Sequence, residues 1–168
     1  MKKKNNYGFT LVEIVIVFVI VGILSITAFI IVGNVLERRI DVAAKKVEAD
    51  IRYAQSLAFS RADNAGISFS VASNSYIVFE NNDITDPAEH PLTKKDFIVD
   101  FDSLTQYKGV QITQVSFPPS ATTTVLFDFL GNPFNEQGIA LSGNGEILLN
   151  GGKRKIIVYK GSGTTEIK

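Results

Sequence analysis

Glu13 is the residue of this sequence best placed to do chemistry, because it is a lone acid at the start of a long apolar run. The nineteen residues from Ile14 to Val32 carry no charge, and a run of this length is enough to span a bilayer. A carboxylate at its edge is costly in lipid, which makes it a candidate functional group by default. Lysines at positions 2–4 predict a cytoplasmic N-terminus, so residues after Gly33 face outward.

Other residue types that do chemistry are absent or scattered. The sequence has no cysteine, which excludes disulfides, thiol nucleophiles and thiolate metal sites. Its single histidine, His90, lies beside Glu89 in a proline-flanked stretch, and no strained nucleophile motif accompanies it. We therefore predict no catalytic residue, no cofactor and no enzymatic activity.

Two groups of charged residues could bind ions. The cluster Lys153-Arg154-Lys155 could contact phosphate, but a solvated turn after Gly152 is favoured. Several acids could supply oxygen ligands to calcium, but they lack the spacing and the turn glycine of a calcium loop, so ordinary surface acids are favoured and no metal site is predicted. These acids are Asp83, Asp86, Glu89, Asp100 and Asp102.

A single long helix must position Glu13. No proline occurs before Pro87, so nothing interrupts a helix between Phe9 and about Arg61. Beyond the charge-free run the apolar residues recur every three or four positions, which predicts an amphipathic second half packed on a sheet. This stripe consists of Leu36, Ile40, Ala43, Val47, Ile51, Ala54 and Ala58.

Local signals support the second half of this helix. Asp41 precedes Lys45, and Glu48 precedes Arg52, each by four residues, which predicts two favourable pairs on the solvated side. Asn64-Ala65-Gly66 supplies the stop signal.

After Gly66 the apolar period changes from 3.6 to 2, which predicts strands joined by turns. The predicted fold class is α+β, with one long helix packed on mostly antiparallel β-sheet. A polar loop is expected at 81–95, and hairpin turns at 143–145 and 150–152. The predicted strands are 67–71, 76–79, 97–101, 110–117, 123–129, 138–141, 146–149 and 153–159. Aromatic residues expected in the core are Phe97, Phe101, Phe117, Phe127, Phe129 and Phe134.

The order Gly8-Phe9-Thr10-Leu11-Val12-Glu13, between a basic leader and an uninterrupted apolar run, resembles the class III signal of type IV pilins and type II secretion pseudopilins. The resemblance implies a prepilin peptidase that cuts between Gly8 and Phe9 and methylates the new amino group of Phe9. It also implies three parts: a cleaved leader at 1–8, a transmembrane and filament-core helix at 9–33, and an extracytoplasmic pilin-like domain at 34–168.

The same resemblance implies a role for Glu13 and a set of partners. The carboxylate of Glu13 would pair with the N-terminal amine of a neighbouring subunit, or with its own Phe9 amine, which neutralises charge in a low-dielectric bundle. The implied partners are other pilins or pseudopilins in a filament or tip complex, the peptidase and an inner-membrane assembly platform. The implied location is the inner membrane, with a periplasmic C-terminal domain.

The downstream segments 54–61, 67–69, 127–132, 138–141 and 153–158 resemble the GspH/FimT branch of minor pseudopilins and minor pilins. This implies a minor pseudopilin of a type II secretion system, or alternatively a minor pilin of a type IV pilus that serves pilus assembly or DNA uptake. Removing the leader leaves 14 basic and 17 acidic residues, a charge near −3 that argues against nucleic acid as a partner.

Two other interpretations of the apolar run stay open at this point. A secretory signal peptide would be cut near Ser25–Ala28, although its apolar core spans about 7–15 residues and this run is longer. A plain signal anchor would tolerate Glu13 near the lipid headgroups.

Overall fold

The computed structural model describes residues 10–168, apart from the side chains of residues 26–34. Gly8 and Phe9 lie outside the described residues. The chain divides into two compact units, residues 1–37 and 38–168, and each is described by itself.

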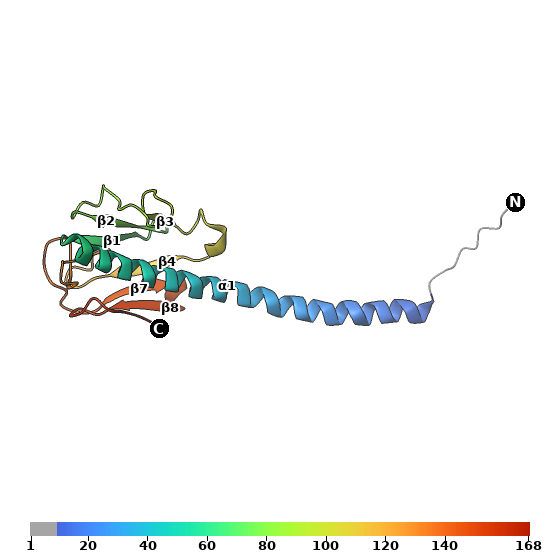
Figure 1. The fold of residues 1–168 in the computed structure, drawn as a ribbon. Helices are drawn as coiled ribbons and strands as arrows, with labels where there is room; N and C mark the ends of the chain where they lie inside the picture. The colour runs from blue at the N-terminus through green and yellow to red at the C-terminus, as the bar shows by residue number, and fades with distance from the viewer. Residues whose placement is uncertain (1–9) are drawn as a thin grey trace. The chain divides into compact units, whose positions relative to one another are not determined.

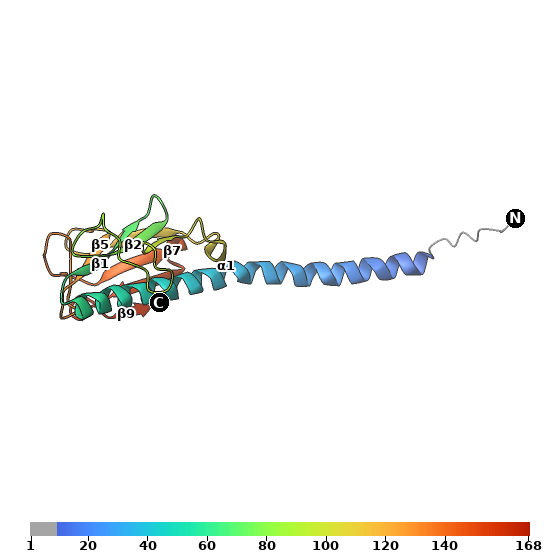
Figure 2. The ribbon, with the colours of Figure 1, turned by 45° about the horizontal axis from the view of Figure 1, so that its top comes forward.

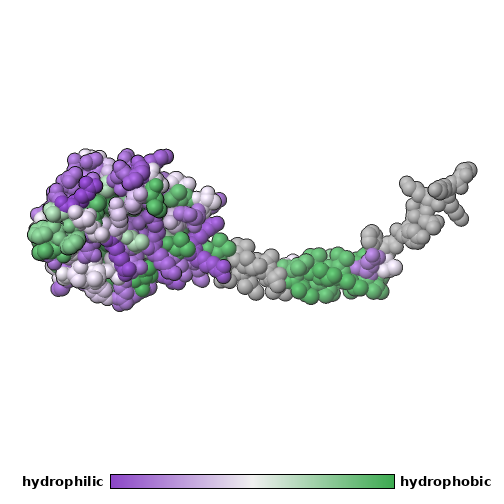
Figure 3. Space-filling model, in the orientation of Figure 1, coloured by the Kyte–Doolittle hydropathy of each residue, from purple (hydrophilic) through white to green (hydrophobic). Residues whose placement is uncertain are grey.

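A single helix, α1 (Leu11–Arg61), confirms the predicted long helix and its end (Figure 1). In the first unit the large apolar side chains from Leu11 to Leu24 are 48–79% exposed, and Figure 3 shows them as continuous apolar surface. Among the residues whose side chains the structure describes, no helix is long and apolar enough to cross a membrane. The predicted span at 9–33 includes Phe9 and the side chains of 26–33, which lie outside that description.

In the second unit the predicted apolar stripe of α1 is buried from Ile40 to Ala58. Glu48 pairs with Arg52 as predicted, with 2.8 Å between Oε1 and Nη2. The prediction for Asp41 is wrong: its carboxylate pairs with Arg154, 113 residues further along, at 2.6 Å. A tertiary partner brought close by the fold has replaced the local one.

The predicted stop signal at 64–66 is also wrong in detail. The helix ends at Arg61, and Ala62 takes the left-handed conformation at φ +54°. The N–H of Asp63 donates to the carbonyl of Ala58, and the N–H of Ala62 to that of Phe59, the bonding pattern of a Schellman cap. Gly66 instead lies in a strand, where an added Cβ would stand 2.7 Å from the carbonyl oxygen of Val125.

Two antiparallel sheets complete the second unit, which confirms the α+β prediction. Within the described residues one sheet has the order β3-β2-β1-β5-β6 and the other β4-β7-β8-β9. All strand pairs are antiparallel. The strands are β1 (Ala65–Ser70), β2 (Ser75–Glu80), β3 (Ile98–Asp100), β4 (Ile112–Ser116), β5 (Thr124–Phe127), β6 (Pro133–Phe134), β7 (Gly145–Leu149), β8 (Arg154–Val158) and β9 (Thr165–Ile167), with short 3-10 turns at Thr105–Tyr107 and Asn150–Gly152.

The predicted strands are found within two residues of their expected ends, except the one at 138–141. That segment makes only an isolated bridge between Ala140 and Phe134. The turn predicted at 143–145 is wrong as well, because Gly145 opens β7, where an added Cβ would meet the ring of Phe117 at 2.2 Å. The turn at 150–152 is confirmed, since it joins the antiparallel strands β7 and β8.

The core lies where α1 contacts both sheets (Figure 2). Tyr76 of β2 and Thr165 of β9 both hydrogen-bond to side chains of α1. Most of the predicted core aromatics are buried, but Phe134 is half-buried and Phe129 is 54% exposed. Phe129 lies past the end of β5, so the alternation that predicted its burial has already stopped there.

Candidate functional site

Glu13 lies in the first turn of α1, and its position there has a local structural reason. The Oγ1 of Thr10 accepts the N–H of Glu13 at 3.2 Å, and the carbonyl of Thr10 accepts the N–H of Ile14. Thr10 is therefore the N-cap and Glu13 the third helical residue, the spacing of a capping box. No cap was predicted at Thr10, although the segment Thr10-Leu11-Val12-Glu13 carries this signal in the sequence.

The carboxylate of Glu13 is available for a partner. None of the ion pairs found among residues 10–168 includes it, and Ile14, Val17 and Phe18 line a hollow with it. The helix dipole favours an anion at this end. The geometry therefore presents one negative charge within an apolar helix surface.

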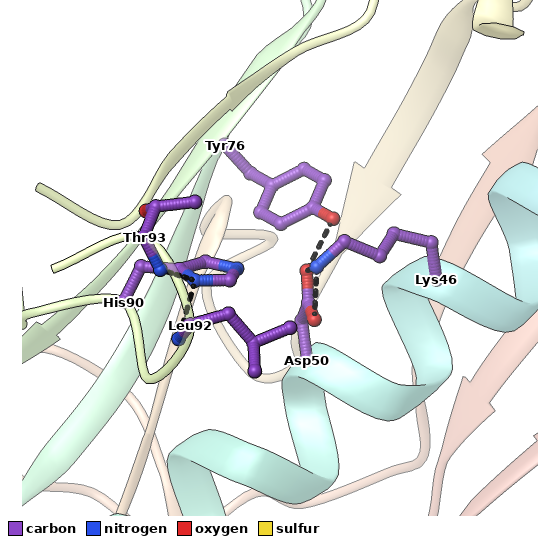
Figure 4. A network of polar contacts seen from close by, with 6 residues as sticks. All are labelled: Lys46, Asp50, Tyr76, His90, Leu92 and Thr93. Carbon is purple, nitrogen blue, oxygen red and sulfur yellow. Dashed lines mark hydrogen bonds and ion pairs between the residues drawn. The ribbon is translucent and has the colours of Figure 1, made fainter. Parts of the chain in front are cut away.

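Lys46, Asp50 and Tyr76 form a charged cluster inside the second unit, which was not predicted (Figure 4). We call it the Asp50 cluster. Asp50 is 4% exposed. Its two carboxylate oxygens accept hydrogen bonds from Nζ of Lys46 at 2.7 Å each, and Oδ2 accepts one from the hydroxyl of Tyr76 at 2.6 Å. The signal in the sequence is slight: Lys46 and Asp50 are four residues apart on the face beside the apolar stripe.

Burial dominates the electrostatics of this cluster. Desolvation raises the pKa of Asp50 above its ordinary value of 3.8, although the hydrogen bonds from Lys46 and Tyr76 act in the opposite direction. Desolvation, followed by the charge of Asp50, raises the pKa of Tyr76 well above 10.0. The cluster therefore joins α1 to β2 through a carboxylate that is costly to leave without its partners.

His90 belongs to the edge of this cluster and has a structural role. Its ring packs on Phe97 with 4.4 Å between centroids, and Nζ of Lys46 lies 5.0 Å from the same Phe97 ring. The Nδ1 of His90 accepts the backbone N–H groups of Leu92 and Thr93. These contacts fold the end of the loop at 81–95 over the cluster, and they orient no nucleophile toward the histidine.

The Asp50 cluster predicts a pH dependence of stability. Because the pKa of Asp50 is raised on folding, the folded chain binds this proton more tightly than the unfolded chain. The contribution of Asp50 to the unfolding free energy is therefore greatest below pH 3.8 and falls as pH rises through the higher folded pKa. Thermal unfolding of the full chain in detergent, measured from about pH 4 to pH 8, should show the advantage of wild type over Asp50→Asn shrinking as pH rises. An advantage that grows with pH would mean that the Lys46 ion pair outweighs burial.

Two of the five acids considered for calcium serve local turns, and a third bonds to a distant residue. Asp83 accepts the N–H and hydroxyl of Thr85, and Asp100 accepts the N–H of Asp102. The carboxylate of Asp102 in turn accepts the side-chain amide of Asn74. Within the part of the chain that the structure describes, no three acid or histidine side chains gather in a way that could hold a metal ion.

The cluster at 153–155 does not form a free basic patch. Arg154 pairs with Asp41 on α1, and Lys155 pairs with Glu146 on β7 at 3.1 Å. With two of its three cations paired to acids, the cluster has little charge left for phosphate.

The prokaryotic N-terminal methylation motif matches residues 3–29 of the chain. No curated protein matches the sequence. Among solved structures, the minor pseudopilin EpsH of the type 2 secretion system of Vibrio cholerae is 10% identical with a TM-score of 0.52, over 77% of this chain and 96% of that chain. The chain has a pilin-like fold.

A second solved structure agrees. The type IV minor pilin FimU of Pseudomonas aeruginosa, in one crystal form, is 16% identical with a TM-score of 0.50, over 78% of this chain and 89% of that chain. At these identities the likeness concerns the fold. Together with the methylation motif, it confirms the pilin-like resemblance drawn from Gly8, Phe9 and Glu13.

Proposed function

We propose that this pilin-like chain is a minor pseudopilin of a type II secretion system and assembles into the pseudopilus or its tip. The observation that carries the proposal is the combination of a methylation motif at 3–29 with a fold that spans 96% of the pseudopilin EpsH. The role is structural rather than enzymatic. The Asp50 cluster and the neighbouring His90 support this assignment, because their polar groups hydrogen-bond to other side chains of the cluster or to backbone N–H groups.

In this proposal the N-terminal segment is processed and then retained. A prepilin peptidase cuts between Gly8 and Phe9 and methylates Phe9. The helix at 9–33 first anchors the chain in the inner membrane, with the domain at 34–168 in the periplasm, and later packs in the filament core. The apolar side chains exposed along residues 11–24 support this, because such a surface needs lipid or neighbouring helices to cover it.

The carboxylate of Glu13 links the packing of the apolar helices to the stagger of neighbouring subunits. In a bundle of apolar helices, its carboxylate and a neighbour's N-terminal ammonium both lack water, and leaving either unpaired costs several kcal/mol. The pair forms only when the subunits are staggered correctly. Glu13 thus favours the addition of a subunit at the assembly platform only when its stagger is correct.

The alternative function is a minor pilin of a type IV pilus. The fold similarity to the minor pilin FimU favours it, with a TM-score of 0.50 and a slightly higher identity of 16%. Binding of nucleic acid gains no support from the cluster at 153–155, since Arg154 and Lys155 are paired with acids.

Deletion of the gene in its own host separates the two functions. For a pseudopilin, the deletion strain should stop releasing the substrates of the secretion system and should keep its surface pili and its uptake of DNA. Reintroducing the wild-type gene should restore secretion. Loss of pili or of DNA uptake with unchanged secretion would instead assign the chain to a pilus.

A further inference from the structure

Three large apolar side chains are exposed at the C-terminal end of α1 and on the turn that follows β5. Phe59 is 72% exposed, Phe129 54% and Leu130 69%. Phe59 and Leu130 line one hollow of about 310 Å³, with Arg52 and Gln55 also in its wall. Figure 3 shows apolar surface gathered at this end of the second unit. We call Phe59, Phe129 and Leu130 the end patch.

Hydrogen bonds hold the turn of the end patch in one conformation. The Oδ1 of Asp128 accepts the N–H groups of Leu130 and Asn132, and its carbonyl accepts the N–H of Gly131. From α1, Nε2 of Gln55 donates to the carbonyls of Gly131 and Ser162 at 2.8 Å each. The backbone that carries Phe129 and Leu130 is therefore held in one conformation, which lowers the entropy cost of binding a partner.

The size of the end patch limits what can cover it. From the exposed fractions, the three side chains present roughly 400 Å². The largest apolar patch on a soluble monomer is typically about 300–600 Å² and is often functional, whereas a stand-alone complex buries about 800 Å² on each side. The end patch therefore suits a partner that another contact already holds in place. In the assembly proposed above, the apolar side chains exposed along residues 11–24 are that other contact.

We propose that the end patch docks the globular domain of a neighbouring pilin-like subunit in the same assembly. This inference rests on the proposed function. The neighbour offers an apolar surface to Phe59 and Leu130, while Arg52, Gln55 and Ser56 form the polar rim that such an interface has. The apolar N-terminal helices supply the main attachment between subunits, and the end patch sets the relative orientation of adjacent globular domains.

Crosslinking tests the proposal, because the chain has no cysteine of its own. Leu130→Cys, labelled in cells with a thiol-reactive benzophenone and irradiated, should crosslink to a second pilin-like subunit identified by mass spectrometry. Leu92→Cys is the matched control, since Leu92 is 86% exposed in the loop at 81–95. Crosslinks to a protein of another class, equal crosslinks from both positions, or none from position 130 would overturn the proposal.

A paired measurement separates this inference from the proposed function. Full-length chains with Phe59→Ser plus Leu130→Ser should recover about tenfold less of the neighbouring subunit on co-purification, and Leu92→Ser should match wild type. If the wild-type chain recovers no pilin-like subunit, the proposed function fails. If wild type recovers one and the double variant recovers the same amount, only the role of the end patch fails.

Discussion

Glu13→Gln is expected to abolish incorporation of the chain into its filament or tip complex while leaving membrane insertion and leader cleavage intact. Glutamine can take the same third position of a capping box, so the start of α1 is preserved. Only the negative charge is lost, and a neighbour's N-terminal ammonium is then buried without a partner at a cost of several kcal/mol. A loss of roughly a hundredfold or more in recovered partner subunits follows from a cost of that size. Co-purification with the partner pilins measures it.

Thr10→Ala provides the control for that experiment. It removes the Oγ1 that accepts the N–H of Glu13 and keeps the charge, so it should weaken the helix start by about 1 kcal/mol and leave assembly near wild type. If Glu13→Gln recovers its partners as wild type does, the charge of Glu13 has no part in assembly. The same conclusion follows if Thr10→Ala impairs assembly as strongly as Glu13→Gln.

Gly8→Val is expected to block removal of the leader almost completely. A peptidase that cuts after Gly8 must approach the backbone closely, and a branched side chain would stand in its way. The chain would keep residues 1–8, with their three lysines, and its Phe9 amine would not form. Without that amine the pair with Glu13 is lost, so assembly should stop as well. Intact mass and co-purification measure the two effects.

Gly22→Val is the matched control within the apolar run. An added Cβ at Gly22 meets no atom within 4 Å, so this change should leave cleavage unaffected. If the Gly8→Val chain matures to the same mass as wild type, Gly8 is not required for cleavage. Equal loss from both variants would point to a general disturbance of the segment.

The sequence predicted the long helix and most strands because these elements depend on local periodicity. The apolar stripe from Ile40 to Ala58 and the alternation in β1 and β7 follow from which face is buried. The pair Glu48–Arg52 was predicted for the same reason, since its members are one helical turn apart.

What the sequence did not predict depends on contacts between distant segments. Besides Lys46 on the same helix, Asp50 is bound by Tyr76, which lies on another element. Asp41 pairs with Arg154 of β8 and not with Lys45 as predicted. β9 was missed because its short polar segment pairs with β8, and pairing rather than composition makes it a strand. At Glu13 the chemistry of the lone acid was predicted from the residues around it, while the Thr10 hydroxyl that accepts its backbone N–H was overlooked.

The mass of the chain isolated from its own host tests the central claim most directly. We predict a mature protein that has lost residues 1–8 and carries one added methyl group on Phe9. A fragment spectrum that places the methyl group on the Phe9 amine would complete the test. A mature N-terminus near Ala28, or an unprocessed chain that begins at Met1 in a host with an active prepilin peptidase, would contradict it.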